Sequence, residues 1–104
     1  NLKLIISELG MDRTQIPAGC PDPGDKAAWK ELEGFWVANQ HGGNGVEAYL
    51  KELTWYDQQM REDSYVIGAA IFTAGYSEGG SESWGPFDVH PLLVPLANYL
   101  ATQR

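Results

Sequence analysis

Glu8 is the side chain of this sequence best suited to chemistry. It lies near the end of a short apolar run, residues 2–9, and Gly10 follows that run directly. We interpret the run as a buried strand, because its apolar residues lack strict alternation. A carboxylate held at the end of such a strand can attack an electrophilic carbon or exchange a proton. The alternative is a structural carboxylate that accepts hydrogen bonds from neighbouring backbone or from an Arg. The residue alone does not separate these interpretations.

Further charged side chains lie in the loops that follow the two predicted strands. Asp12 and Arg13 come just after Glu8 and could contact a substrate or orient that carboxylate, although exposed loop charges are more often only solvated. Glu78 and Glu82 lie in a Gly- and Ser-rich loop, which holds a side chain less firmly than catalysis requires. We therefore do not assign the second carboxyl group of a catalytic pair to them.

Metal and nucleotide sites are not indicated by the sequence. His41 and His90 have no His or Cys partner at metal-ligand spacing, and Cys20 is the only cysteine. Residues 42–45 are rich in glycine, but no Lys-Ser or Lys-Thr pair follows them as in a phosphate-binding loop. The sequence thus predicts no metal and no cofactor, and it leaves the compartment open, with secretion among the options.

Composition limits the kinds of ligand to be considered. The chain has 104 residues, of which 43% are hydrophobic and 20% charged, as in one ordinary folded domain. Its net charge of −7 argues against binding to nucleic acid or to an anionic membrane surface, and it has no apolar run long enough to span a bilayer. Four Trp residues supply aromatic surface for a core and for a ligand face. A neutral or cationic ligand therefore fits best.

Strands and helices are predicted to alternate along the chain. The apolar runs at residues 2–9 and 65–73 lack strict alternation, which is typical of parallel strands covered on both faces. Helices are predicted at residues 26–36, 45–62 and 91–102. This βαβα order indicates an α/β fold with parallel strands. Two strands alone rarely form a stable sheet, so we expect the chain to be a piece of a larger protein whose sheet has more strands.

The helix at residues 45–62 has the clearest pattern. Its apolar residues recur at spacings of three and four, as one face of an amphipathic helix requires, and they are Val46, Tyr49, Leu50, Leu53, Tyr56 and Met60. Asn44 stands at the N-cap position, and Glu47 three residues later completes a capping-box-like start. In the last helix Pro91 suits a first position, whereas Pro95 is expected to delay or bend the start.

Four segments together resemble a known family. They are Leu-Ile-Ile-Ser-Glu-Leu-Gly at residues 4–10, Leu-Thr-Trp-Tyr-Asp at 53–57, Tyr-Val-Ile-Gly-Ala-Ala-Ile-Phe-Thr at 65–73 and Trp-Gly-Pro-Phe-Asp at 84–88. They are similar to the C-terminal part, strand seven to helix eight, of retaining (β/α)8-barrel glycoside hydrolases. The resemblance implies that residues 1–104 form a partial TIM barrel of two β/α units.

The resemblance also implies roles for individual residues. Glu8 matches the nucleophile at the end of strand seven, and Trp84 is the nearest match to an aromatic platform for sugar. We expect Asp12 and Phe72 to be further substrate contacts. The Asn-Glu pair that carries the general acid after strand four in this family is absent from the sequence. This chain therefore holds half of a catalytic site.

Two functions follow as hypotheses. The first is a glycoside hydrolase that cleaves a polysaccharide or glycan, with the remainder of the barrel supplying the acid, since retention needs two carboxyl groups about 5 Å apart. The second is a non-catalytic domain derived from a barrel, which binds glycan or a protein partner. Under either hypothesis the chain alone is expected to be inactive, and its uncovered strand edges predict association with the rest of a barrel or with itself.

Overall fold

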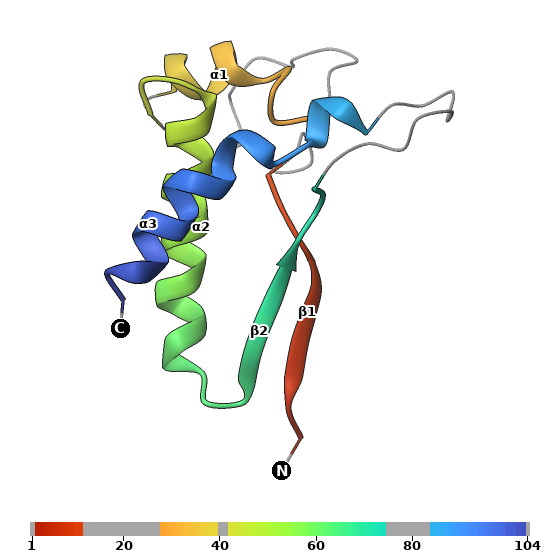
Figure 1. Cartoon of the computed structure of the whole chain (residues 1–104), viewed down its shortest axis with the longest axis vertical. Helices are drawn as coiled ribbons and strands as arrows, with labels where there is room; N and C mark the ends of the chain where they lie inside the picture. The colour runs from red at the N-terminus through yellow and green to blue at the C-terminus, as the bar shows by residue number, and fades with distance from the viewer. Residues whose placement is uncertain (1, 12–27, 40–41, 75–83, 104) are drawn as a thin grey trace.

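The computed structural model describes residues 2–11, 28–39, 42–74 and 84–103, which form a small α/β fold (Figure 1). Two parallel strands alternate with helices in an open sheet, as the βαβα order predicts. In chain order the elements are β1 (Leu4–Leu9), α1 (Glu33–Ala38), α2 (Gly45–Glu62), β2 (Val66–Ile71), the 3-10 turns η2 (Gly85–Phe87) and η3 (His90–Leu92), and α3 (Leu93–Ala101).

The pairing of the two strands brings distant parts of the chain to the same end of the sheet. β1 pairs with β2 in parallel register, with Leu4 opposite Val66 and Leu9 opposite Ile71. At the carboxyl end the backbone N–H of Phe72 donates to the carbonyl of Leu9 at 2.9 Å. Because both strands run the same way, the residues that follow each of them meet at one end of the sheet.

Helix α2 has the predicted bounds, and its start has the predicted cap. The Asn44 side chain accepts a hydrogen bond from the backbone N–H of Glu47 at 2.9 Å. The Glu47 carboxylate accepts in turn from the N–H of Gly43 at 2.7 Å. Two N–H groups near the start of the helix are thereby satisfied, and Ala48, Tyr49 and Leu53 face the core.

Within the described part of the predicted segment 26–36, which begins at residue 28, helix α1 starts later than predicted. Residues 29–32 form turns, and the helix begins at Glu33. In this segment the backbone N–H of Lys30 donates to the carbonyl of Pro86, far along the chain. This tertiary hydrogen bond stands beside local turn bonds, such as the one from the Leu32 N–H to the carbonyl of Ala28 at 3.2 Å.

The last helix begins at Leu93 after the turn η3, which contains Pro91. Pro95 is the third residue of α3, where a backbone N–H has no acceptor within the helix. The missing N–H of Pro95 therefore costs little, and the expected delay of the helix start is observed.

The core lies at the carboxyl end of the strands, among the segment 28–38, the first half of α2 and the turn η3. Trp29 and Tyr49 are its central aromatic pair, with ring centroids 5.3 Å apart. The buried hydrophobic residues are Met11, Ala28, Trp29, Leu32, Trp36, Ala48, Tyr49, Leu53, Val89 and Leu92.

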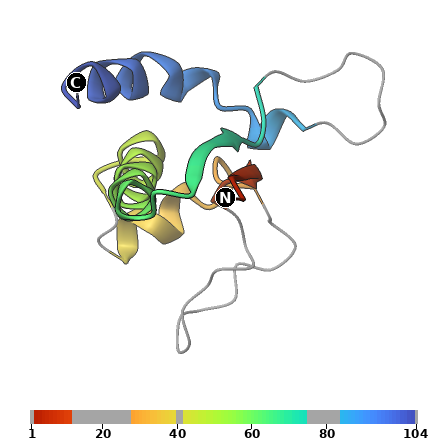
Figure 2. The same ribbon diagram turned by 90° about the horizontal axis from the view of Figure 1, so that it is seen from below.

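The expectation that both faces of the strands are covered is wrong for the described residues. All three helices lie to one side of the strands, and Figure 2 shows the same arrangement from below. Ile5 and Ile67 are accordingly 63% and 59% exposed. Among the described helices, none combines the length and the apolar character that crossing a membrane requires.

A polar cluster links α2 to α3. The guanidinium Nε of Arg61 donates to Asp57 Oδ2 at 2.8 Å, and the Tyr99 hydroxyl donates to the same oxygen at 2.9 Å. The pKa of Tyr99 is raised, first because burial disfavours the phenolate and then because the phenol donates to Asp57. The Tyr99 hydroxyl therefore loses its proton at a higher pH than an ordinary phenol, whose pKa is 10.0.

Replacing Tyr99 with Phe tests this link through its pH dependence. A pKa that is raised by folding contributes stability that is complete below pH 10 and is lost as the pH rises through the folded-state value. We expect Tyr99→Phe to lower the free energy of unfolding at neutral pH, and the gap to wild type to narrow above pH 10. Urea denaturation of both proteins from pH 7 to pH 11 measures that gap. A gap that stays constant over this range would contradict the assignment.

Candidate functional site

A pocket of about 390 Å³ opens at the carboxyl end of the two strands. We call it the strand-end pocket. Its lining residues come from the end of β1, the end of β2 and the turn η2, and they are Glu8, Leu9, Gly10, Met11, Phe72, Trp84 and Phe87. The parallel pairing of the strands is what brings these three segments together.

Three aromatic rings form one side of the strand-end pocket, and we call them the aromatic wall. Phe72 lies edge-on to Trp84, with ring centroids 5.2 Å apart and an interplanar angle of 90°. Phe87 completes the group at 5.6 Å from Trp84 and 6.1 Å from Phe72. Trp84 is 49% exposed, so part of its surface remains open to a ligand.

Backbone hydrogen bonds hold together the two ends of the loop after β2 and so place Trp84 and Phe87 beside Phe72. The backbone N–H of Val89 donates to the carbonyl of Thr73 at 2.9 Å, which joins the two ends of the loop after β2. The N–H of Phe87 donates to the carbonyl of Trp84 at 2.9 Å within the turn. These two bonds return Trp84 to a position beside Phe72.

Glu8 supplies the charge of the strand-end pocket. Of the described residues that line it, Glu8 alone has an ionisable side chain. It lies one residue before the end of β1 and is exposed to solvent. A carboxylate beside apolar rings suits a ligand that is neutral, polar at its edges and apolar on its faces.

The predicted site residues divide into two groups. Glu8, Phe72 and Trp84 lie together in the strand-end pocket. Asp12 lies outside the described residues. The other loop residues considered from the sequence also lie there, namely Arg13, Cys20, His41, Glu78 and Glu82. Of the two histidines, His90 is described, and its Nδ1 lies 2.7 Å from Asp88 Oδ1.

The strand-end pocket is also lined by four residues that were not predicted as site residues, namely Leu9, Gly10, Met11 and Phe87. Phe87 had a signal in the sequence, because it belongs to the same Trp-Gly-Pro-Phe-Asp segment as Trp84. Met11 is buried in the core as well as facing the pocket, which no local pattern indicates. Within the described ranges, no group of three or more His, Cys, Asp or Glu side chains could hold a metal ion.

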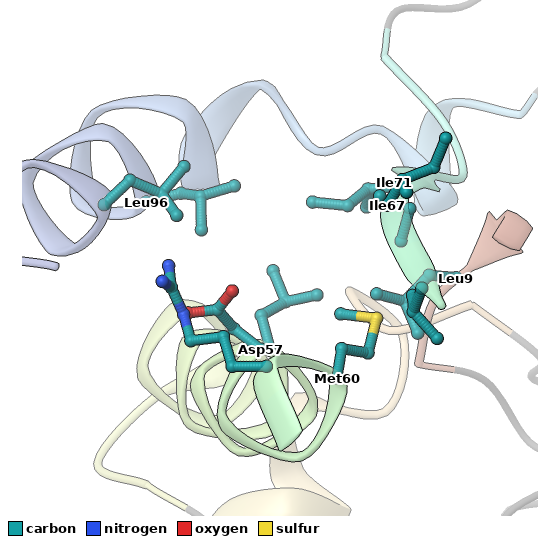
Figure 3. A pocket seen from close by; sticks show the side chains of 12 residues that line it. Leu9, Asp57, Met60, Ile67, Ile71 and Leu96 are labelled. Atoms are coloured by element: carbon teal, nitrogen blue, oxygen red, sulfur yellow. The ribbon is translucent and has the colours of Figure 1, made fainter. Parts of the chain in front are cut away.

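A second pocket, of about 280 Å³, lies between α2, α3 and β2. Figure 3 shows Leu96 from α3, Asp57 and Met60 from α2, and Ile67 and Ile71 from β2 facing this space. Its charged groups bind each other in the Asp57 and Arg61 ion pair. The pocket is thus a mostly apolar gap along β2, and the Asp57 carboxylate that lines it is already paired with Arg61.

Comparisons of the chain with protein-family models, with curated proteins and with solved structures found no significant match.

Gly10 shapes the strand-end pocket through its close approach to the core. A Cβ at this position would lie 3.1 Å from the Tyr49 hydroxyl oxygen and 3.4 Å from the carbonyl of Phe72. Tyr49 is fully buried and has little freedom to move. The small residue therefore lets the end of β1 pack directly on α2.

We expect Gly10→Ala to lower the free energy of unfolding by about 1–3 kcal/mol, because the added methyl group overpacks the contact with Tyr49. Gly68→Ala is the matched control, since a Cβ at Gly68 in β2 meets nothing within 4 Å. That control should be neutral or stabilising by up to about 1 kcal/mol. Urea denaturation measures both effects, and equal behaviour of the two variants would refute the packing argument.

Proposed function

We propose that this chain is the C-terminal part of a (β/α)8-barrel glycoside hydrolase that cleaves a polysaccharide or glycan at the strand-end pocket. The observation that carries the proposal is the convergence of Glu8 with the aromatic wall at the carboxyl end of two parallel strands. In α/β barrels, active sites are built at that end of the strands. The resemblance of the four segments to retaining glycosidases points to the same chemistry.

The aromatic rings that line the strand-end pocket, and the absence of a cation among its described lining residues, suit a neutral sugar. The C–H faces of a pyranose stack on aromatic rings, and Trp84 presents a half-exposed ring beside Phe72 and Phe87. Among the described lining residues there is no cation that would favour a phosphate or a carboxylate. The net charge of −7 likewise disfavours an anionic ligand.

Glu8 would act as the nucleophile of a retaining reaction. One of its carboxylate oxygens forms a bond to the anomeric carbon while the glycosidic C–O bond breaks, and an acid protonates the departing oxygen. Water then attacks the anomeric carbon and releases Glu8, with the same acid group now acting as base. The second carboxyl group, about 5 Å from Glu8, would come from the remainder of the barrel.

The same remainder would cover the open sheet. Ile5 and Ile67 expose apolar side chains on the two strands, and the gap between β2 and α3 is lined mostly by apolar groups. Exposed apolar surface next to an unpaired strand edge favours association. Further barrel strands would bury this surface, and self-association of the chain is the alternative cover.

One observation favours a second candidate function, a non-catalytic glycan-binding domain. The described lining of the strand-end pocket includes one carboxyl group, whereas hydrolysis with retention requires two. A domain with the same aromatic wall would bind sugar through stacking and hydrogen bonds alone. The two functions share the ligand and differ in the role of Glu8.

Sugar binding is tested by comparing two tryptophans of similar exposure. Trp84 is 49% exposed in the aromatic wall, and Trp55 is 52% exposed on α2, outside the strand-end pocket. We expect Trp84→Ala to weaken binding of a soluble neutral oligosaccharide by about tenfold or more, and Trp55→Ala to leave it unchanged. Calorimetric titration with β-linked glucose, mannose, xylose and galactose oligomers measures the affinities. Absence of binding to the whole panel, or equal effects of both variants, would count against the proposal.

The nucleophile is tested with a reagent that needs no general acid. In a 2,4-dinitrophenyl 2-deoxy-2-fluoroglycoside the phenolate leaves with its electron pair unassisted, and the Glu8 carboxylate takes its place on the anomeric carbon. We expect a glycosyl adduct on Glu8 by peptide mass spectrometry, lost in Glu8→Gln and retained in the control Glu62→Gln at the end of α2. Sugar binding without an adduct would instead support the non-catalytic function.

A further inference from the structure

The turn that holds Trp84 and Phe87, two of the three rings of the aromatic wall, is short and has few internal hydrogen bonds. Gly85–Phe87 is a single 3-10 turn between Trp84 and Asp88. Inside the turn, the N–H of Phe87 donates to Trp84 and the N–H of Asp88 donates to Gly85, at 2.9 and 3.1 Å. Such a turn needs outside contacts to hold two large rings in one orientation.

Two consecutive residues more than 50 positions earlier in the chain supply those contacts. The Lys30 Nζ donates to the carbonyl of Gly85 at 3.1 Å, and the Lys30 N–H to that of Pro86 at 3.4 Å. The indole N–H of Trp29 donates to the carbonyl of Phe87 at 3.1 Å. All three carbonyls of the turn thus accept from Trp29 and Lys30.

An ion pair extends the same set of contacts. The Lys30 ammonium lies 3.3 Å from Asp88 Oδ2, and the side chains are 33% and 15% exposed. The other oxygen of Asp88 accepts from the backbone N–H of His90 at 3.2 Å and lies 2.7 Å from His90 Nδ1. The ammonium is also 5.6 Å from the centroid of the Trp29 ring, so its direction is restrained from several sides.

We infer that Trp29, Lys30 and Asp88 form a clamp that sets the aromatic wall, and that Lys30 is a positioning residue for ligand binding at Trp84 and Phe87. Where the ligand is a sugar, the inference rests on the proposed function. Lys30 does not line the strand-end pocket, so it acts through the turn rather than by contact. Rings held in place before binding cost less to order when the ligand arrives.

Trp29 and Lys30 have different roles in the clamp: Trp29 also stabilises the fold, whereas Lys30 positions the turn. Trp29 is buried in the core, and its loss would destabilise the fold. Lys30 is only partly buried, so removing its ammonium leaves the core packing intact while the turn loses the bond to Gly85 and the ion pair. The expected result is a displaced wall in a folded protein.

The experiment compares Lys30→Met with Lys30→Arg and with Lys3→Met. Lys3 is the matched control, because its Nζ also donates to one backbone carbonyl, that of Ser64 at 2.9 Å, at the opposite end of the strands. Each protein is labelled with 5-fluorotryptophan, and the ¹⁹F resonances of Trp84 and Trp55 are assigned with Trp→Phe variants. Oligosaccharide affinity and urea stability are measured on the same proteins.

We expect Lys30→Met to shift or broaden the Trp84 resonance, to leave Trp55 unchanged, and to weaken oligosaccharide binding by about tenfold. Lys30→Arg, which keeps the charge and the donors, should restore part of both effects, and Lys3→Met should change neither. An unchanged Trp84 resonance in Lys30→Met would overturn the clamp. If Lys30→Met does not fold, Asp88→Asn weakens the same ion pair and is measured in its place.

The two proposals fail independently in this experiment. The ¹⁹F spectrum reports the position of Trp84 without any ligand, so it tests the clamp even if no oligosaccharide binds. Absence of binding by the wild-type chain counts against the sugar site alone. A displaced Trp84 with unchanged oligosaccharide affinity would overturn the role of Lys30 in binding.

Discussion

The packing of Trp29 against Tyr49 is the interaction on which most of the described structure depends. It joins the segment before α1 to α2, and the Tyr49 hydroxyl lies close to Gly10, just after the end of β1. A buried indole N–H needs an acceptor, and here the acceptor is the carbonyl of Phe87. The same side chain that fills the core therefore also fixes the turn that carries the aromatic wall.

The hydrophobic core and the strand-end pocket consequently lie at the same end of the molecule. Met11 belongs to the core and also lines the strand-end pocket, and Gly10 lets the end of β1 approach Tyr49. Toward the other end the strands are less covered, with Ile5 and Ile67 exposed. A well-packed end holds side chains in fixed positions, as a binding site requires, whereas exposed apolar strands favour a covering partner.

Several elements were predictable because their determinants are local. The bounds of α2 follow from apolar spacing and from the Asn44 cap, and the strands lie within the predicted apolar runs. Glu8 and Phe72, which were predicted as site residues, lie in the same pocket, and their roles there stay predictions. The start of α1 and the coverage of the strands were predicted wrongly, because the first depends on bonds to the turn Gly85–Phe87 and the second on which elements lie nearby.

The sequence by itself determined the element types and the parallel order of the strands, because helical period, caps and apolar runs act over a few residues. The roles of Glu8 and Trp84 are implied by the resemblance and stay predictions. Only the tertiary structure decided that Phe87 joins the aromatic wall and that Lys30 holds it. The contacts of Lys30 with Gly85 and Asp88 join residues 55 and 58 positions apart, and Trp29 and Phe87 are likewise 58 positions apart. Contacts at that range depend on how the elements pack, and no local spacing encodes them.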